Sequence, residues 1–165
     1  MILSSFRSVT QIQRLFLAFL LFLSACNNPT SSQSNREGDF PNATQVTLEM
    51  GTGINLGNVF DLGAHRFDFF ELAAIIATYE QAGMKHIRIP TTWMDPVNGS
   101  ALTDDNGKVN FEHPRFSVLK QVIDFAVERE LYVVLNAHHE RSFKANYDGS
   151  AYYNDKLQTL WTDIA

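Results

Sequence analysis

The sequence predicts an α/β fold with a parallel sheet, because strand and helix patterns alternate and long connections separate the strands. Apolar segments of strand length occur at 53–56, 86–89 and 131–135. A stretch with apolar residues at helical spacing follows each of them. The last of these segments, LYVVL, is apolar throughout, which is typical of a parallel strand buried on both faces.

The first predicted strand, at 53–56, is bounded by glycines. We expect the following helix to begin at Asp68, because Glu71 completes a capping box three residues later. It should end near Gly83, since glycine suits a C-terminal cap. Its apolar stripe consists of Leu72, Ile75, Ile76 and Tyr79.

The second strand, at 86–89, is ended by Pro90, and Pro114 suits the first position of the second helix. The apolar stripe of that helix consists of Phe116, Leu119, Ile123, Ala126 and Val127. A third helix is expected from about Asn154. Its stripe, which we assign to the core, consists of Leu157, Leu160, Trp161 and Ile164.

No glycine-rich phosphate loop follows the first strand, so a dinucleotide-binding fold is poorly supported. A (β/α)8 TIM barrel fits better, and residues 40–165 would supply about its first three βα units only. Three units cannot close an eight-stranded barrel, and they would leave a sheet edge exposed. We therefore expect a truncated barrel that is unstable or aggregated by itself.

Residues 1–25 have the form of a secretory signal, with basic residues, an apolar run at 15–23 and a small-residue cleavage site. The segment before Cys26, the only cysteine, resembles a bacterial lipobox, in which the cysteine is lipidated. The alternative is a plain signal peptide with a chance cysteine. Residues 26–39 contain no large apolar side chain and predict a flexible linker. The resemblance implies secretion across the inner membrane and a lipid anchor in the outer membrane or at the cell surface.

The formal net charge is −5, and the basic residues form no cluster. This argues against a nucleic acid partner and is compatible with a neutral polymer.

Polar residues follow each predicted strand, and the carboxyl ends of barrel strands meet at one rim. Asn58 and Asp61 follow the first strand. The later strands contribute Arg88, Trp93, Asn136, His138, His139 and Glu140.

Four segments carry a resemblance to glycoside hydrolase family 5, the cellulase and mannanase family: GINLGN at 53–58, HIRIPTTW at 86–93, VVLNAHHE at 133–140 and LWTDIA at 160–165. The resemblance implies a retaining glycosidase that needs no metal or other cofactor. Its implied substrate is a β-1,4-linked polysaccharide. Endoglucanase is the first expectation, ahead of xyloglucanase, mannanase and licheninase.

By this resemblance, Arg88 supports the nucleophilic carboxylate and His138 lies beside the sugar at the point of cleavage. Asn58, Trp93 and His139 are candidate substrate-binding residues. Each has a structural alternative: Asn58 as a loop asparagine, Trp93 as rim packing, and His139 as a histidine on the opposite face of an extended segment.

The family's acid/base glutamate follows an asparagine after the fourth strand, and its nucleophilic glutamate follows the seventh. No Asn-Glu pair occurs in this sequence. We therefore expect the chain alone to be an inactive N-terminal fragment, because a retaining glycosidase needs two carboxyl groups about 5–5.5 Å apart.

Two other functions remain open. One is a non-catalytic, carbohydrate-binding surface lipoprotein that uses the same rim. The other is a metal-dependent barrel hydrolase that uses His138, His139 and Glu140. We disfavour the second because adjacent histidines on a strand point apart and no metal-motif spacing is present.

Overall fold

The computed structural model describes residues 42–63 and 68–165. The predicted signal peptide, the linker and Cys26 lie outside the described residues. The elements along the chain are α2 (Ala43–Met50), β1 (Gly53–Asn55), α3 (Phe69–Gln81), β2 (His86–Thr91), α4 (Pro114–Glu128), β3 (Tyr132–Ala137), α5 (Arg141–Asn146) and α6 (Ala151–Ile164). No helix in these ranges has the length and apolar character that a membrane crossing requires.

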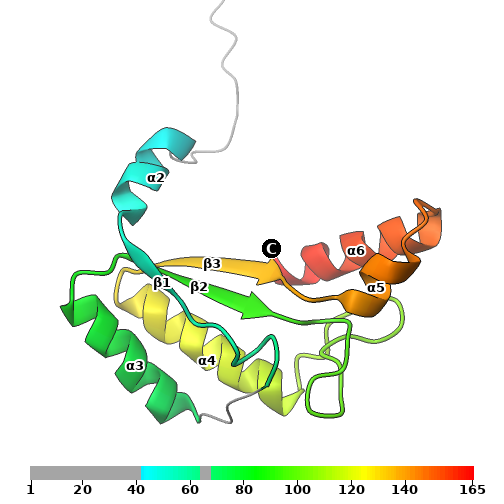
Figure 1. Cartoon of the computed structure of the whole chain (residues 1–165), viewed down its shortest axis with the longest axis horizontal. Coiled ribbons are helices and arrows are strands. Elements are labelled where there is room, and N and C mark those ends of the chain that lie inside the picture. Colours follow the sequence, from blue (N-terminus) through cyan, green and yellow to red (C-terminus); the bar gives the residue numbers. More distant parts are fainter. Residues whose placement is uncertain (1–41, 64–67) are drawn as a thin grey trace, which may run out of the picture. The chain divides into compact units, whose positions relative to one another are not determined.

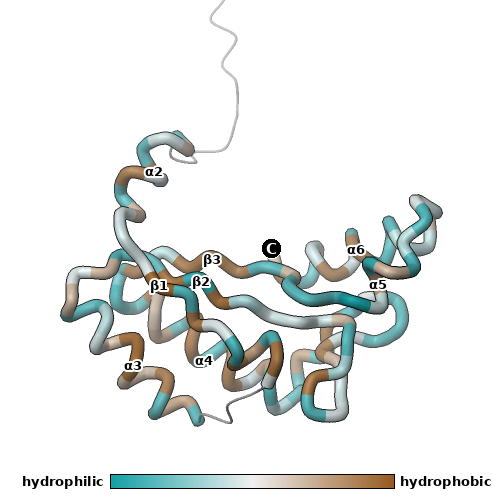
Figure 2. Tube along the Cα trace, viewed as in Figure 1, coloured by the Kyte–Doolittle hydropathy of each residue, from teal (hydrophilic) through white to brown (hydrophobic). Residues whose placement is uncertain are grey.

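The three strands form one parallel sheet in the order β1-β2-β3, as the sequence predicted (Figure 1). Ile54, Ile87 and Val133 stand at the same level of the sheet. All three belong to, or pack against, a hydrophobic core shared with α3 and α4. These two helices cover one face of the sheet, and the apolar residues concentrate between the two layers (Figure 2).

Helix α3 begins with the predicted capping box. The Asp68 carboxylate accepts from the Glu71 backbone N–H at 3.0 Å, and the Glu71 carboxylate accepts from the Asp68 N–H at 2.9 Å. Leu72 and Ile76 are buried, whereas Tyr79 is 42% exposed. The predicted core positions are therefore confirmed at Leu72 and Ile76 and wrong at Tyr79.

Helix α4 begins at Pro114 as predicted. Its buried residues are Leu119, Val122 and Ala126. Val127 is 58% exposed, so its assignment to the core is wrong. Successive helix residues are about 100° apart, and a helix that buries Ala126 and Val122 turns Val127 outward.

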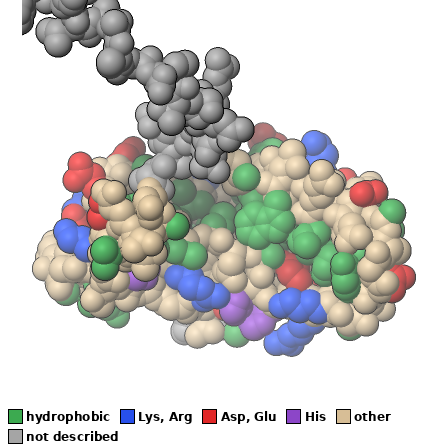
Figure 3. Space-filling model, turned by 90° about the horizontal axis from the view of Figure 1, so that it is seen from above, with side chains coloured by type: hydrophobic (Ala, Val, Ile, Leu, Met, Phe, Trp, Pro, Cys, Tyr) green, Lys and Arg blue, Asp and Glu red, His purple; other side chains and the backbone are tan. Residues whose placement is uncertain are grey.

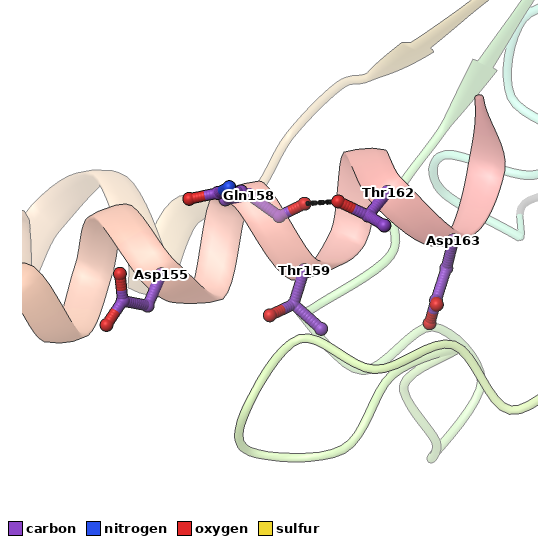
Figure 4. Close-up of a pocket in the computed structure, with 5 residues that line it drawn as sticks. All are labelled: Asp155, Gln158, Thr159, Thr162 and Asp163. Carbon is purple, nitrogen blue, oxygen red and sulfur yellow. Dashed lines mark hydrogen bonds between the residues drawn. The ribbon is translucent and has the colours of Figure 1, made fainter.

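Helix α6 begins at Ala151, earlier than the predicted Asn154. Leu160 is buried as expected, but Trp161 is 39% exposed and not a core residue. A shallow hollow of about 320 Å³ runs along α6 (Figure 4). All of its lining residues belong to this one helix, so it is an open helix surface. They are Asp155, Gln158, Thr159, Thr162 and Asp163.

The sheet face opposite α3 and α4 carries Asn55 and Arg88 at one level. In a closed barrel this face points to the interior. Figure 3 looks onto it, with histidine side chains beside lysine or arginine side chains near one edge. Helix α2, which the sequence did not predict, touches the amino-terminal ends of β2 and β3. The His86 Nδ1 lies 2.9 Å from the Met50 carbonyl oxygen, and the Tyr132 hydroxyl donates to Glu49 at 2.6 Å.

Candidate active site

Arg88 and His138 lie together, as the sequence predicted, although β2 continues through Pro90 to Thr91 and Arg88 stands within the strand rather than at its end. Arg88 Nη1 donates to Asn55 Oδ1 at 2.5 Å. Arg88 Nη2 and Asn136 Nδ2 each lie 3.3 Å from His138 Nδ1. Asn55 and Asn136 therefore hold the two candidate site residues in place.

The guanidinium of Arg88 has only neutral partners within the described ranges. Asn55 contributes an amide oxygen and His138 a ring nitrogen, and no carboxylate there forms an ion pair with Arg88. A partly buried cation normally has an acidic partner. The face of Arg88 directed toward the barrel interior therefore suits an anion.

Asp61 lies in the loop after β1 and is only 5% exposed. Its Oδ2 atom is 3.9 Å from His138 Nε2 and 3.7 Å from His139 Nε2. Its Oδ1 atom has no hydrogen-bond partner among the described residues. The Thr92 hydroxyl donates to the Asp61 carbonyl oxygen at 2.9 Å, which ties this loop to the end of β2. The sequence placed Asp61 on the rim but gave it no role.

His138 and His139 lie side by side, with ring centroids 4.4 Å apart. The expectation that His139 points to the opposite face is wrong, because β3 ends at Ala137 and strand alternation ends with it. Burial lowers the pKa of His138, the neighbouring His139 ring and Arg88 lower it further, and Asp61 partly opposes this shift. The neutral imidazole is therefore favoured.

Glu140 is 2% exposed, and its backbone φ is 29°, in the left-handed region. Its carboxylate accepts from the backbone N–H groups of Trp93, Met94 and Asp95 at 2.6, 2.9 and 3.2 Å. In return, the Asp95 carboxylate accepts from the N–H groups of Arg141 and Ser142. We call this pair of carboxylates, Glu140 and Asp95, the rim clamp, because it fastens the loop after β2 to the segment after β3.

Arg115 of α4 lies under the rim clamp. It donates to the Thr92 carbonyl oxygen at 3.1 Å. Burial lowers the pKa of Arg115 to about 10, and the charge of Glu140 partly opposes that shift. Arg115 therefore stays protonated at neutral pH and provides a cation near the buried Glu140.

Of the three predicted substrate-binding residues, Trp93 is buried, whereas Asn58 and His139 lie on the rim. Trp93 is fully buried, and its indole Nε1 donates to the Asn136 carbonyl oxygen at 3.2 Å. It cannot offer a ring face to a sugar in this structure, so the expectation that Trp93 binds substrate gives way to the packing alternative. Asn58 is exposed on the loop after β1, with a φ of 67°. His139 lies beside Asp61, as described above.

The side chains that could hold a metal ion differ from those expected. One ligand atom from each of Asp61, His138 and His139 lies within 4.8 Å of the other two. Glu140 is not part of this group, because the loop at 93–95 binds its carboxylate. Two imidazoles and one carboxylate make a recognised transition-metal ligand set.

Comparison with known proteins identifies the family. The family model described as Cellulase (glycosyl hydrolase family 5) matches residues 49–165. Endoglucanase A of Clostridium longisporum is 34% identical over 158 residues, which is 87% of this chain and 28% of that protein. Endoglucanase A of Paenibacillus barcinonensis is 31% identical over 137 residues, or 74% of this chain and 33% of that protein. The chain thus spans about a third or less of these relatives.

A solved structure shows the same fold. It is XEG5B, described as a GH5 xyloglucan-specific beta-1,4-glucanase from a ruminal metagenomic library, in complex with XXLG. The match has a TM-score of 0.54 and 22% identity, and covers 75% of this chain and 36% of that one. The predicted α/β fold, part of a (β/α)8 barrel, is confirmed. The chain belongs to glycosyl hydrolase family 5, the cellulase family.

Proposed function

We propose that the complete gene product hydrolyses a β-1,4-linked polysaccharide with retention of stereochemistry, and that an endoglucanase activity is the first to test. Family membership supports glycosidase chemistry. The names of the relatives, endoglucanases in several bacteria, support a β-glucan substrate. The xyloglucan-specific glucanase with the similar fold makes xyloglucan the second substrate to test.

The observation that carries this proposal is the uncompensated charge of Arg88. Its guanidinium is fixed by Asn55 and His138 but is neutralised by no carboxylate in the described part of the chain. A planar, permanently charged group held in this way can bind a carboxylate with two parallel hydrogen bonds. A nucleophilic glutamate held there would remain ionised, as attack on the sugar requires.

The carboxylates that this chain brings to the rim already bind other protein groups. Asp61 faces two imidazoles, and the rim clamp residues Asp95 and Glu140 accept backbone N–H groups. None of these three is available as an acid/base or a nucleophile. We therefore propose that Arg88 and His138 support catalysis, and that two glutamates outside residues 1–165 act as the acid/base and the nucleophile.

The test compares residues 26–165 with the complete gene product on β-glucan, carboxymethylcellulose, xyloglucan and mannan, by release of reducing ends. We expect turnover by the complete product only. In that protein Arg88→Ala should lower kcat by about 10²–10³, because one preorganised charge is removed from the transition state. Glu112→Gln, an exposed change, is the control. Turnover by residues 26–165 alone, or an unaltered kcat for Arg88→Ala, would contradict the proposal.

A non-catalytic, carbohydrate-binding role is the weaker candidate. Of the candidate substrate-binding residues on the rim, Trp93 is buried and offers no ring face to a sugar.

We also propose that Cys26 carries a lipid anchor in the outer membrane or at the cell surface. The support is the sequence before Cys26 alone. Incorporation of labelled palmitate that Cys26→Ser abolishes is the expected result, and incorporation that persists in Cys26→Ser would contradict it.

A further inference from the structure

We propose that Asp61 is a positioning residue, which acts through His138 to orient the guanidinium of Arg88. The inference rests on the proposed function, because it names a residue that prepares Arg88 for its carboxylate. The first supporting observation is that two hydrogen-bond donors lie beside one ring nitrogen of His138.

The Nδ1 atom of His138 lies 3.3 Å from Arg88 Nη2 and 3.3 Å from Asn136 Nδ2. An arginine nitrogen only donates hydrogen bonds. Nδ1 must therefore be the acceptor, without a proton of its own. In a neutral imidazole the other nitrogen, Nε2, then carries the proton.

The protonated Nε2 points to Asp61. Asp61 Oδ2 is the carboxylate oxygen beside Nε2, at 3.9 Å, and Asp61 is 95% buried. A hydrogen bond would need an approach of about 1 Å, and such contacts often tighten only when the reacting groups are bound. The approach is favourable because a buried carboxylate is stabilised by hydrogen-bond donors, and the described residues place only imidazole nitrogens beside Oδ2.

Asp61, His138 and Arg88 then form a chain of groups in which the donor and the acceptor of each contact are fixed. The carboxylate fixes the proton on Nε2, which leaves the Nδ1 lone pair directed at Arg88. Asn55 accepts from the other terminal nitrogen of Arg88, so that both ends of the guanidinium are held. His139 places a second ring nitrogen near the same carboxylate, with Nε2 at 3.7 Å from Oδ2.

The same assignment decides between this role and a metal site. A metal ion bound by Asp61, His138 and His139 would need the lone pair of His138 Nε2, because Nε2 is the atom closest to Asp61. The proton would then move to Nδ1 and face the donor groups of Arg88 and Asn136. Two donors in contact are unfavourable, so the geometry favours a hydrogen-bonded chain over a bound ion.

The experiment uses the complete gene product with Asp61→Ala and Asp61→Asn. Asparagine keeps the shape and can place its oxygen at the Oδ2 position that faces both imidazoles, so it removes mainly the charge, whereas alanine removes the acceptor as well. Loss of such an outer partner typically lowers activity by about 10–100-fold. We expect that loss in kcat, with KM near the wild-type value, because Arg88 acts on the transition state. Asp124→Asn, an exposed change on α4, is the matched control.

A nuclear magnetic resonance measurement separates this inference from the proposed function. Long-range ¹H–¹⁵N spectra report which ring nitrogen of His138 carries the proton, whether or not the protein turns over any polysaccharide. We expect Nε2–H in the wild type and a changed or mixed tautomer in Asp61→Ala. A wild-type proton on Nδ1, or zinc binding that Asp61→Ala abolishes, would overturn the inference. An inactive wild type with the Nε2–H tautomer would count against the proposed function only.

Discussion

Replacement of Glu140 should be among the most destabilising single changes on the rim. The side chain is 2% exposed and accepts three backbone hydrogen bonds from the loop at 93–95. Hydrogen bonds to a charged group contribute about 1.5–3 kcal/mol each, and an N–H left without a partner in a buried site costs about 1–3 kcal/mol. Arg115 below would also lose its nearby anion.

Glu140→Gln and Glu140→Ala should differ in how much free energy of unfolding they lose. In Glu140→Gln the retained oxygen can serve Met94 and Asp95 from the position of Oε2, and only the Trp93 N–H loses its acceptor. We expect a loss of about 2–4 kcal/mol in the free energy of unfolding, from one unpaired N–H and the missing charge. Glu140→Ala removes all three bonds, and a loss of about 3–5 kcal/mol is expected, the range for a broken buried pair.

The assay is urea unfolding at pH 7, followed by the fluorescence of the buried Trp93 and by circular dichroism. Hydrogen exchange of the amides at 93–95 should rise in both variants, which localises the effect to the loop. The exposed Glu112→Gln serves as the control and should stay within about 0.5 kcal/mol of the wild type. A Glu140→Gln protein as stable as this control would refute the idea that the carboxylate holds the loop.

Two further predictions concern other parts of the fold. Gly107→Ala should destabilise the protein by more than about 1 kcal/mol, because φ is 86° and a Cβ would overlap with the Lys156 carbonyl oxygen; Gly149→Ala, with φ 79° but open space around it, should cost less in the same urea titration. The hydrogen bond between Tyr132 and Glu49 lowers the pKa of Glu49 and raises the pKa of Tyr132. Its stabilisation is complete above the ordinary pKa of Glu49 and below that of Tyr132. It is lost as pH falls through the lowered value or rises through the raised one. Hydrogen exchange of the α2 amides against pH checks this, and an unchanged pH profile in Tyr132→Phe would contradict it.

The sequence predicted the parallel sheet and the starts of α3 and α4, because local signals determine them. The capping box at Asp68 and the proline at Pro114 act within one turn of their own helices. Arg88 and His138 were also predicted to meet, since the ends of adjacent parallel strands share one edge. The helix starts need no knowledge of distant contacts, and the meeting of Arg88 and His138 needs only the order of adjacent parallel strands.

The features that escaped prediction depend on contacts between distant segments. Helix α2 has no buried residue of its own, and it contacts His86 and Tyr132 far along the chain. Trp161 has the spacing of a core residue, but only its neighbour Leu160 is fully covered. Trp93 is buried in the core and bonded to Asn136 and Glu140, more than 40 residues away, which no local pattern indicates.

The backbone at Glu140 decides how the rim distributes its charges. If the extended geometry of β3 continued past Ala137, His138 and Glu140 would share the face of Arg88, and His139 would point away. Glu140 instead has a left-handed φ of 29°, a conformation that costs on the order of 1–3 kcal/mol and that its three hydrogen bonds offset. This conformation directs the carboxylate to the loop at 93–95, while the end of β3 at Ala137 lets both imidazoles lie beside Asp61. Arg88 is therefore left without an acidic partner among the described residues. It can pair with a carboxylate from another part of the protein, as the proposed chemistry requires.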